Sequence, residues 1–105
     1  MPIIKSSIKD VRRTKTRTAR NSAEKNKIRT AVKAVRGAKT ADEAQAKLKV
    51  AMKVLDKAHA HGIMKKQTAS RTVARLSSFV HKKNERTCMR LYRYHNLSVQ
   101  LEFCV

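Results

Sequence analysis

The chain has 105 residues and a formal net charge of +19, because 26 Lys and Arg face only 7 Asp and Glu. A charge of this size repels itself in a compact state, so we expect a polyanionic partner, with nucleic acid the first candidate and an anionic membrane the second. The sequence has neither a secretory leader nor a run of about 18 apolar residues, which argues against export and against a membrane span.

Helix breakers are rare along the chain. Pro2 is the only proline, and Gly37 and Gly62 are the only glycines. Since Ala, Lys, Arg, Gln and Glu are frequent, we predict three long helices that join at or near the two glycines. Only 22 residues are Ile, Val, Leu or Phe, so these helices can bury one thin core, as expected of a single small domain.

The first predicted helix covers residues 4–36. Apolar side chains recur at helical spacing over residues 4–11 and again over residues 28–35. Between them, residues 12–27 (RRTKTRTARNSAEKNK) offer no apolar side chain larger than alanine. Because this stretch has almost nothing to bury, we expect part of the helix to project, to fray in the free protein and to become ordered on a ligand.

The second predicted helix occupies residues 40–61. Gly37 suits the left-handed position that often follows a helix end, and Thr40 with Glu43 matches a capping box at the next helix start. Gly62 is expected to stop this helix in a Schellman motif. The segment between the glycines is nearly neutral, so we expect it to brace the other two helices. Its predicted buried face carries Ala44, Leu48, Ala51 and Leu55, with Met52 and Ala58 alongside.

The third predicted helix begins between residues 65 and 68 and continues to about residue 83. It carries an apolar stripe and a basic, polar stripe that is shifted by two residues, or about 200° around the helix. We therefore expect one face to pack and the opposite face to present cations, and we place Phe79 in the core. The apolar stripe is Ala69, Val73, Leu76 and Val80, and the opposite stripe is Arg71, Arg75, Ser78 and Lys82.

Residues 85–105 differ in composition from the rest of the chain. They contain no Lys, and they hold both tyrosines and both cysteines. Residues 97–105 (LSVQLEFCV) alternate apolar and polar residues in part, as a strand would, but no other segment offers a strand to pair with. The predicted fold is all-α, a three-helix bundle in residues 1–84 with a long, partly projecting first helix and an appendage of open structure in residues 85–105.

No arrangement of side chains indicates catalysis, a metal or a cofactor. Asp42 and Glu43 lie in the first turn of a helix, where the macrodipole is a sufficient explanation for them. His59 and His61 are two residues apart and point to different sides of a helix. We expect no small-molecule substrate either, and two cysteines near one end favour a reducing compartment. The remaining candidate ligands match no zinc spacing: Cys88, His95 and Cys104.

The basic and small polar residues instead indicate binding to a nucleic-acid backbone. Phosphate contacts need only cations and small hydrogen-bond donors at flexible reach. Aromatic residues that could stack on bases are almost absent, so the partner should be recognised by its shape and its phosphates. The residues predicted to bind are Lys5, Ser6, Lys9, Arg12, Arg13, Lys15, Arg17, Arg20, Asn21, Lys25, Lys27, Arg29, Lys65, Lys66, Arg71, Arg75, Ser78 and Lys82.

The order of several short segments resembles the bacterial ribosomal protein S20 family over about residues 2–84. After its second glycine the family usually has Gly, an apolar residue, Ile, His, Lys and Asn, whereas this chain has GIMKKQ at residues 62–67 and keeps the positive charge. The matching segments are IIKSSIK (3–9), RN (20–21), IRTAVKAVR (28–36) and LDKAHAHGIMKKQTASR (55–71).

The resemblance implies a three-helix protein that binds small-subunit ribosomal RNA and helps to fold and hold it, with no catalytic role. It also implies a monomer within a ribosome of the cytoplasm or of an organelle, where other small-subunit proteins are possible neighbours. Two rival functions share the charge. A nucleoid-type DNA-binding protein would show a groove-reading helix or a dimer interface, and a membrane-active helix would place large apolar residues opposite its cations; neither pattern is visible.

Overall fold

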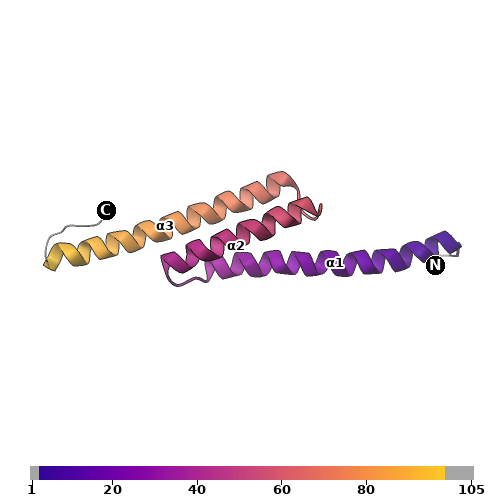
Figure 1. The fold of residues 1–105 in the computed structure, drawn as a ribbon, viewed down its shortest axis with the longest axis horizontal. Coiled ribbons are helices and arrows are strands. Elements are labelled where there is room, and N and C mark those ends of the chain that lie inside the picture. Colours follow the sequence, from indigo (N-terminus) through magenta and orange to yellow (C-terminus); the bar gives the residue numbers. More distant parts are fainter. Residues whose placement is uncertain (1–2, 99–105) are drawn as a thin grey trace.

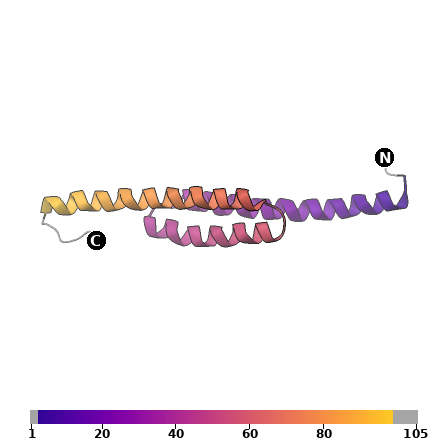
Figure 2. The same cartoon turned by 90° about the horizontal axis from the view of Figure 1, so that it is seen from above.

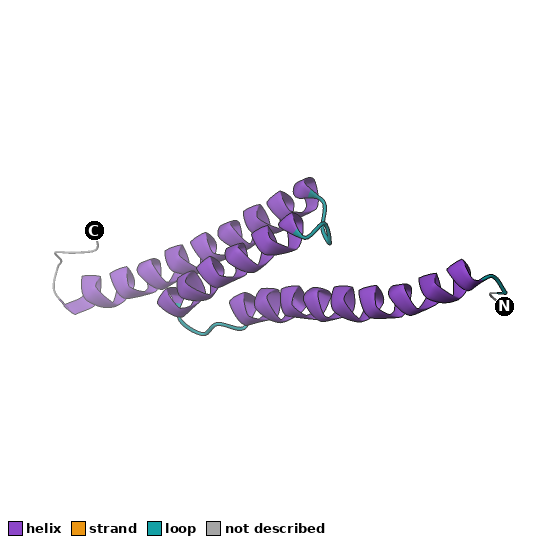
Figure 3. Ribbon diagram, turned by 45° about the vertical axis from the view of Figure 1, so that its right-hand side comes forward, coloured by secondary structure: helices purple, strands orange, loops and turns teal. Residues whose placement is uncertain are grey.

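Three helices make up the part of the chain that the structure describes. The computed structural model describes residues 3–98, with the surroundings of side chains as far as residue 89. The helices are α1 (Lys5–Arg36), α2 (Ala41–Ala60) and α3 (Lys66–Ser98). No strand occurs between residues 3 and 98 (Figure 3). The predicted all-α, three-helix fold is confirmed.

The molecule is an elongated rod. Its principal extents are 80 × 21 × 17 Å and its radius of gyration is 21.5 Å, whereas a compact domain of this length would have a radius of gyration of about 13 Å. The helix α2 lies between α1 and α3, which touch each other much less (Figures 1 and 2). The first half of α1 and the last part of α3 extend beyond α2 at opposite ends. The helix α2 therefore braces the other two, as its composition predicts.

The core is thin because alanine supplies much of it. The largest fully buried side chains are Val35, Leu55 and Leu76, one from each helix. On α2 the predicted face is largely confirmed, although Leu48 is half-buried and Met52 is 38% exposed. The residues of the central cluster are Ile28, Val35, Ala38, Ala44, Ala51, Leu55, Ala58, Leu76 and Val80.

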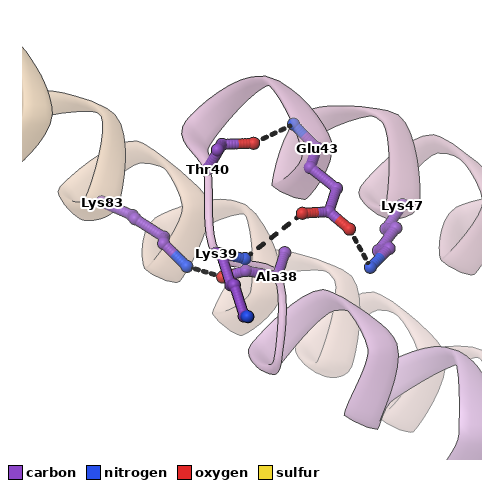
Figure 4. A network of polar contacts seen from close by, with 6 residues as sticks. All are labelled: Ala38, Lys39, Thr40, Glu43, Lys47 and Lys83. Atoms are coloured by element: carbon purple, nitrogen blue, oxygen red, sulfur yellow. Dashed lines mark hydrogen bonds and ion pairs between the residues drawn. The ribbon is translucent and has the colours of Figure 1, made fainter.

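The end of α1 differs from the prediction at Gly37. This residue is right-handed, with φ −84° and ψ −3°, so the left-handed stop predicted there was wrong. Its N–H donates to the Lys33 carbonyl at 2.8 Å, which continues the helical pattern. The chain turns instead at Ala38, which is 3% exposed and whose carbonyl accepts a hydrogen bond from Lys83 of α3 (Figure 4). The burial of Ala38 and its hydrogen bond from Lys83 therefore fix the end of α1.

Thr40 caps the start of α2 as predicted, but the second half of the capping box differs, because Glu43 accepts from the Lys39 N–H and not from that of Thr40. Thr40 Oγ1 accepts a hydrogen bond from the Glu43 N–H at 3.2 Å. The Glu43 carboxylate accepts from Lys47 Nζ at 2.5 Å and from the Lys39 N–H at 3.4 Å (Figure 4). These hydrogen bonds, the one from Lys47 above all, lower the pKa of Glu43. The contribution of these hydrogen bonds to the stability of the fold is therefore present at neutral pH. It is lost as the pH falls through the lowered pKa of Glu43.

Replacing Thr40 with alanine is expected to lower the free energy of unfolding by about 1 kcal/mol, because the substitution leaves an amide donor of the first turn without its protein acceptor. Urea denaturation followed by circular dichroism measures the change. The control is Thr18→Ala in the middle of α1, an exposed site where we expect a change within about 0.5 kcal/mol. Equal effects at the two sites would contradict the capping role of Thr40.

The end of α2 forms the predicted Schellman motif. Gly62 is left-handed with φ 74°, a conformation that glycine adopts without a Cβ clash. Its N–H donates to the His59 carbonyl at 2.9 Å, and the Ile63 N–H donates to the Ala58 carbonyl at 3.0 Å. The helix α2 therefore stops where the sequence indicates, and the chain turns directly into α3.

The helix α3 is longer than predicted. It continues to Ser98, well past the end expected near residue 83, because no glycine or proline interrupts residues 66–98. The first part of the extension is therefore helical and continuous with the bundle. Most of the partial strand pattern, together with Cys104, lies outside the described residues.

Candidate nucleic-acid interface

The first half of α1 has almost no protein around it, since only the α2–α3 turn approaches it, near Arg17 and Arg20. Every residue from 8 to 23 is exposed, and the first buried residue of the helix is Ile28. We call residues 5–23 the projecting segment, and Figure 1 shows that most of it extends past the α2–α3 turn, toward the N-terminus. The predicted projection of the stretch that lacks core residues is confirmed.

All of the residues predicted to bind nucleic acid are exposed. They do not form a single patch. One group occupies α1, mostly on the projecting segment, and the other lies on α3 and the turn before it, along the packed bundle (Figure 1). The structure thus gives two cationic regions, a rod that can be approached from several sides and one face of α3.

Four arginines of the projecting segment line one shallow cleft. Arg12, Arg13, Arg17 and Arg20, together with Thr16, surround a volume of about 350 Å³. Their spacing brings consecutive turns of one helix together. None of the four makes an ion pair with another described residue. This arginine cleft therefore keeps its guanidinium donors available for anions such as phosphate, which arginine binds through paired N–H groups.

The threonines of this region are less available than the sequence suggests. Thr14 Oγ1 donates to the Asp10 carbonyl at 2.7 Å, and Thr16 Oγ1 donates to the Arg12 carbonyl at 3.3 Å. Thr30 does the same with the carbonyl four residues before it, at 2.9 Å. Because these hydroxyl hydrogens already serve the helix backbone, the cations are the main donors left for a phosphate.

Two of the predicted binding residues already have partners within α1. Lys27 Nζ donates to Glu24 Oε1 at 2.7 Å, and Arg29 Nη1 donates to Asn26 Oδ1 at 3.4 Å. The hydrogen bond from Lys27 is the main reason that the pKa of Glu24 is lowered. Burial raises this pKa, and the electrostatic influence of Lys27, His61 and Lys57 lowers it further. Glu24 therefore carries its negative charge at neutral pH.

The two faces of α3 are arranged as predicted. Ala69, Leu76 and Val80 are buried and Val73 is half-buried, while the opposite stripe of Arg71, Arg75, Ser78 and Lys82 is exposed.

Phe79 corrects the prediction of a core position, because it is 41% exposed. It lies about 100° around the helix from Val80, at the edge of the apolar stripe. The partly exposed ring of Phe79 therefore stands between the basic residues Arg75 and Lys82 along the chain.

A second cavity contains residues that the sequence reasoning missed. Glu24 of α1 and His61 and Ile63 of the α2–α3 turn lie around it, beside Arg17 and Arg20. No local pattern could have found this group, because it joins two segments that are distant in sequence. Among the described residues no group of His, Cys, Asp or Glu is arranged to hold a metal ion. No helix in the same part of the chain is long and apolar enough to span a membrane.

Comparison with known proteins gives one consistent family. The model of the family described as ribosomal protein S20 matches residues 2–81. The chain is 47% identical to the small ribosomal subunit protein bS20 of Oleidesulfovibrio alaskensis over 79 residues, which are 72% of this chain and 91% of that protein. It is 47% identical to the protein of the same name from Helicobacter acinonychis over 81 residues (74% and 91%) and 41% identical to that from Ligilactobacillus salivarius over 80 residues (74% and 95%).

Proposed function

Because the chain belongs to the ribosomal protein S20 family, we propose that it is a structural constituent of the small ribosomal subunit and binds small-subunit rRNA through phosphate contacts. The observation that carries the binding mode is the projecting segment, where every residue from 8 to 23 is exposed and cations point to several sides of the helix. RNA packed around this segment replaces the protein core that it lacks, and in doing so holds neighbouring RNA helices together.

The contacts follow from the two cationic regions. The arginine cleft and the other predicted residues of α1 bind phosphates along the rod, and Arg71, Arg75, Ser78 and Lys82 of α3 bind a second stretch of backbone. The protein acts as a monomer within the cytoplasmic ribosome, next to other small-subunit proteins, and has no catalytic role. Residues 1–84 form the RNA-binding unit, and residues 85–105 are an extension outside it.

Sedimentation of cell extract tests this function against the rival DNA-binding function. The protein should sediment with small ribosomal subunits and should shift to the top of the gradient after RNase treatment, because RNA holds it there. DNase treatment is the control and should leave its position unchanged. A protein that is released by DNase, or that never sediments with the small subunit, would overturn the proposed function.

A further inference from the structure

A cavity lies where the α2–α3 turn meets α1. Its volume is about 480 Å³. The side of α1 contributes Arg17, Arg20, Asn21, Ala23 and Glu24, and the turn contributes His61 and Ile63. We call it the turn pocket. Small-molecule sites in proteins have volumes of about 300 to 1,000 Å³, so the turn pocket is larger than a single phosphate needs and can hold a nucleotide.

The carboxylate of Glu24 does not suit a site that binds phosphate alone. The side chain of Glu24 is 30% exposed. All of the other acidic residues up to position 89 are exposed. A carboxylate repels phosphate, and this one stays ionised because Lys27 lowers the pKa of Glu24. Lys27 occupies Oε1, whereas Oε2 accepts no hydrogen bond from the described residues. The pocket therefore includes a hydrogen-bond acceptor that suits a ligand with N–H donors and not phosphate alone.

The remaining lining residues complete the set that a nucleotide needs. Arg17 and Arg20 supply cationic donors for its phosphate. Ala23 and Ile63 supply carbon surface against which the face of a base can lie. Glu24 supplies an acceptor for N–H groups on the edge of a base, which proteins reach when a base is unpaired and splayed out of its helix. The cations and the acceptor come from one side of α1, and Ile63 of the α2–α3 turn meets them only in the folded protein.

We propose that the turn pocket binds one unpaired nucleotide of the RNA, with its base edge at Glu24 and its phosphate at Arg17 and Arg20. The inference rests on the proposed RNA-binding function and adds a base-reading site to it. Guanine fits best, because its adjacent N1–H and N2–H₂ donors match the two oxygens of a carboxylate, where Oε2 is open and Oε1 has a second lone pair beside the one that Lys27 uses. Uracil fits worst, since its single N–H lies between two carbonyl oxygens that would face the carboxylate.

Fluorescence anisotropy with labelled single-stranded RNA tests the site in the full-length protein. The probes are an oligouridine of about seven nucleotides and the same oligomer with one central guanosine, a length that suits a single-strand site. The protein should bind the guanosine-containing probe about fivefold or more tighter than the oligouridine, the lower end of what one bidentate base contact contributes. In Glu24→Gln the preference should disappear while the affinity for oligouridine rises slightly.

Glu85→Gln is the matched control, because it removes one negative charge from an exposed site on α3 and should keep the guanosine preference. Loss of preference in Glu24→Gln but not in Glu85→Gln supports the turn pocket. Equal binding of the two probes by the unmodified protein, or a preference that survives Glu24→Gln, overturns it. Weak binding of both probes together with no salt-dependent binding of rRNA would instead contradict the proposed function itself.

Free guanosine monophosphate offers the same base and phosphate, so it serves as a competitor. We expect it to compete only at concentrations far above those of the oligomer, because the RNA chain also binds cations outside the pocket. Competition at the same concentration as the oligomer would assign the pocket to a free nucleotide and overturn its role in RNA binding.

Discussion

Replacing Arg12, Arg13, Arg17 and Arg20 together with glutamine is expected to weaken binding to small-subunit rRNA by about a hundredfold at physiological salt. The four side chains are exposed, line one cleft and make no ion pair within the described residues. Each phosphate contact releases close to one counterion from the nucleic acid. The variant should therefore lose most of the electrostatic gain that the projecting segment provides, with little change in folding, because no buried side chain is altered.

The salt dependence of the affinity for rRNA is a second measurement on the same variant. For the unmodified protein we expect a log–log slope of affinity against salt on the order of −5 or steeper, and the variant should be shallower by about 3 to 4 units. The control removes the same charge from outside the proposed contacts, at the exposed residues Lys39, Lys49, Lys53 and Lys57. If both variants lost affinity and slope equally, net charge alone would explain the binding and the arginine cleft would have no special role.

Local sequence patterns predicted the parts of the fold that local interactions decide. Thr40 caps α2 and Gly62 stops it because hydrogen bonds within a few residues determine both events. The buried stripes of α2 and α3 follow from helical periodicity, which requires only the spacing of the apolar residues. The projecting segment was predictable for the same reason, since the absence of apolar residues can be read directly from the chain.

The errors arose where tertiary contacts compete with local preference. Gly37 was expected to be left-handed, but the burial of Ala38 and its hydrogen bond from Lys83 hold a different turn. Phe79 was expected in the core, yet Leu76 and Val80 form the buried face of α3, and Phe79 lies at the edge of that face with 41% of its surface exposed. The turn pocket was missed because it depends on which part of α1 the α2–α3 turn meets, and no helical period encodes that.

Hydrogen exchange should divide α1 of the free protein into two unequal parts. Amides of residues 12–23 are expected to exchange about a thousandfold faster than those of residues 28–35, because only the second group is protected by the packed core. The first group has helical hydrogen bonds but no buried side chain, and isolated helices of this length are marginal in water. The β-branched Thr14, Thr16 and Thr18 weaken the helix further. From the sequence, the stretch without core residues is 12–27. In the structure we expect fast exchange only in residues 12–23, because Glu24 is already half-buried.

Adding rRNA should slow exchange of residues 12–23 by about a hundredfold or more while residues 28–35 change little, because ligand binding stabilises the helical form only where the ligand contacts it. Exposed residues of α2 are the internal control, since they share the exposure of the projecting segment but belong to a helix that packs on both neighbours. Strong protection of residues 12–23 without RNA would mean that the segment is rigid by itself. RNA would then bind a preformed rod rather than supply the surroundings that keep it helical.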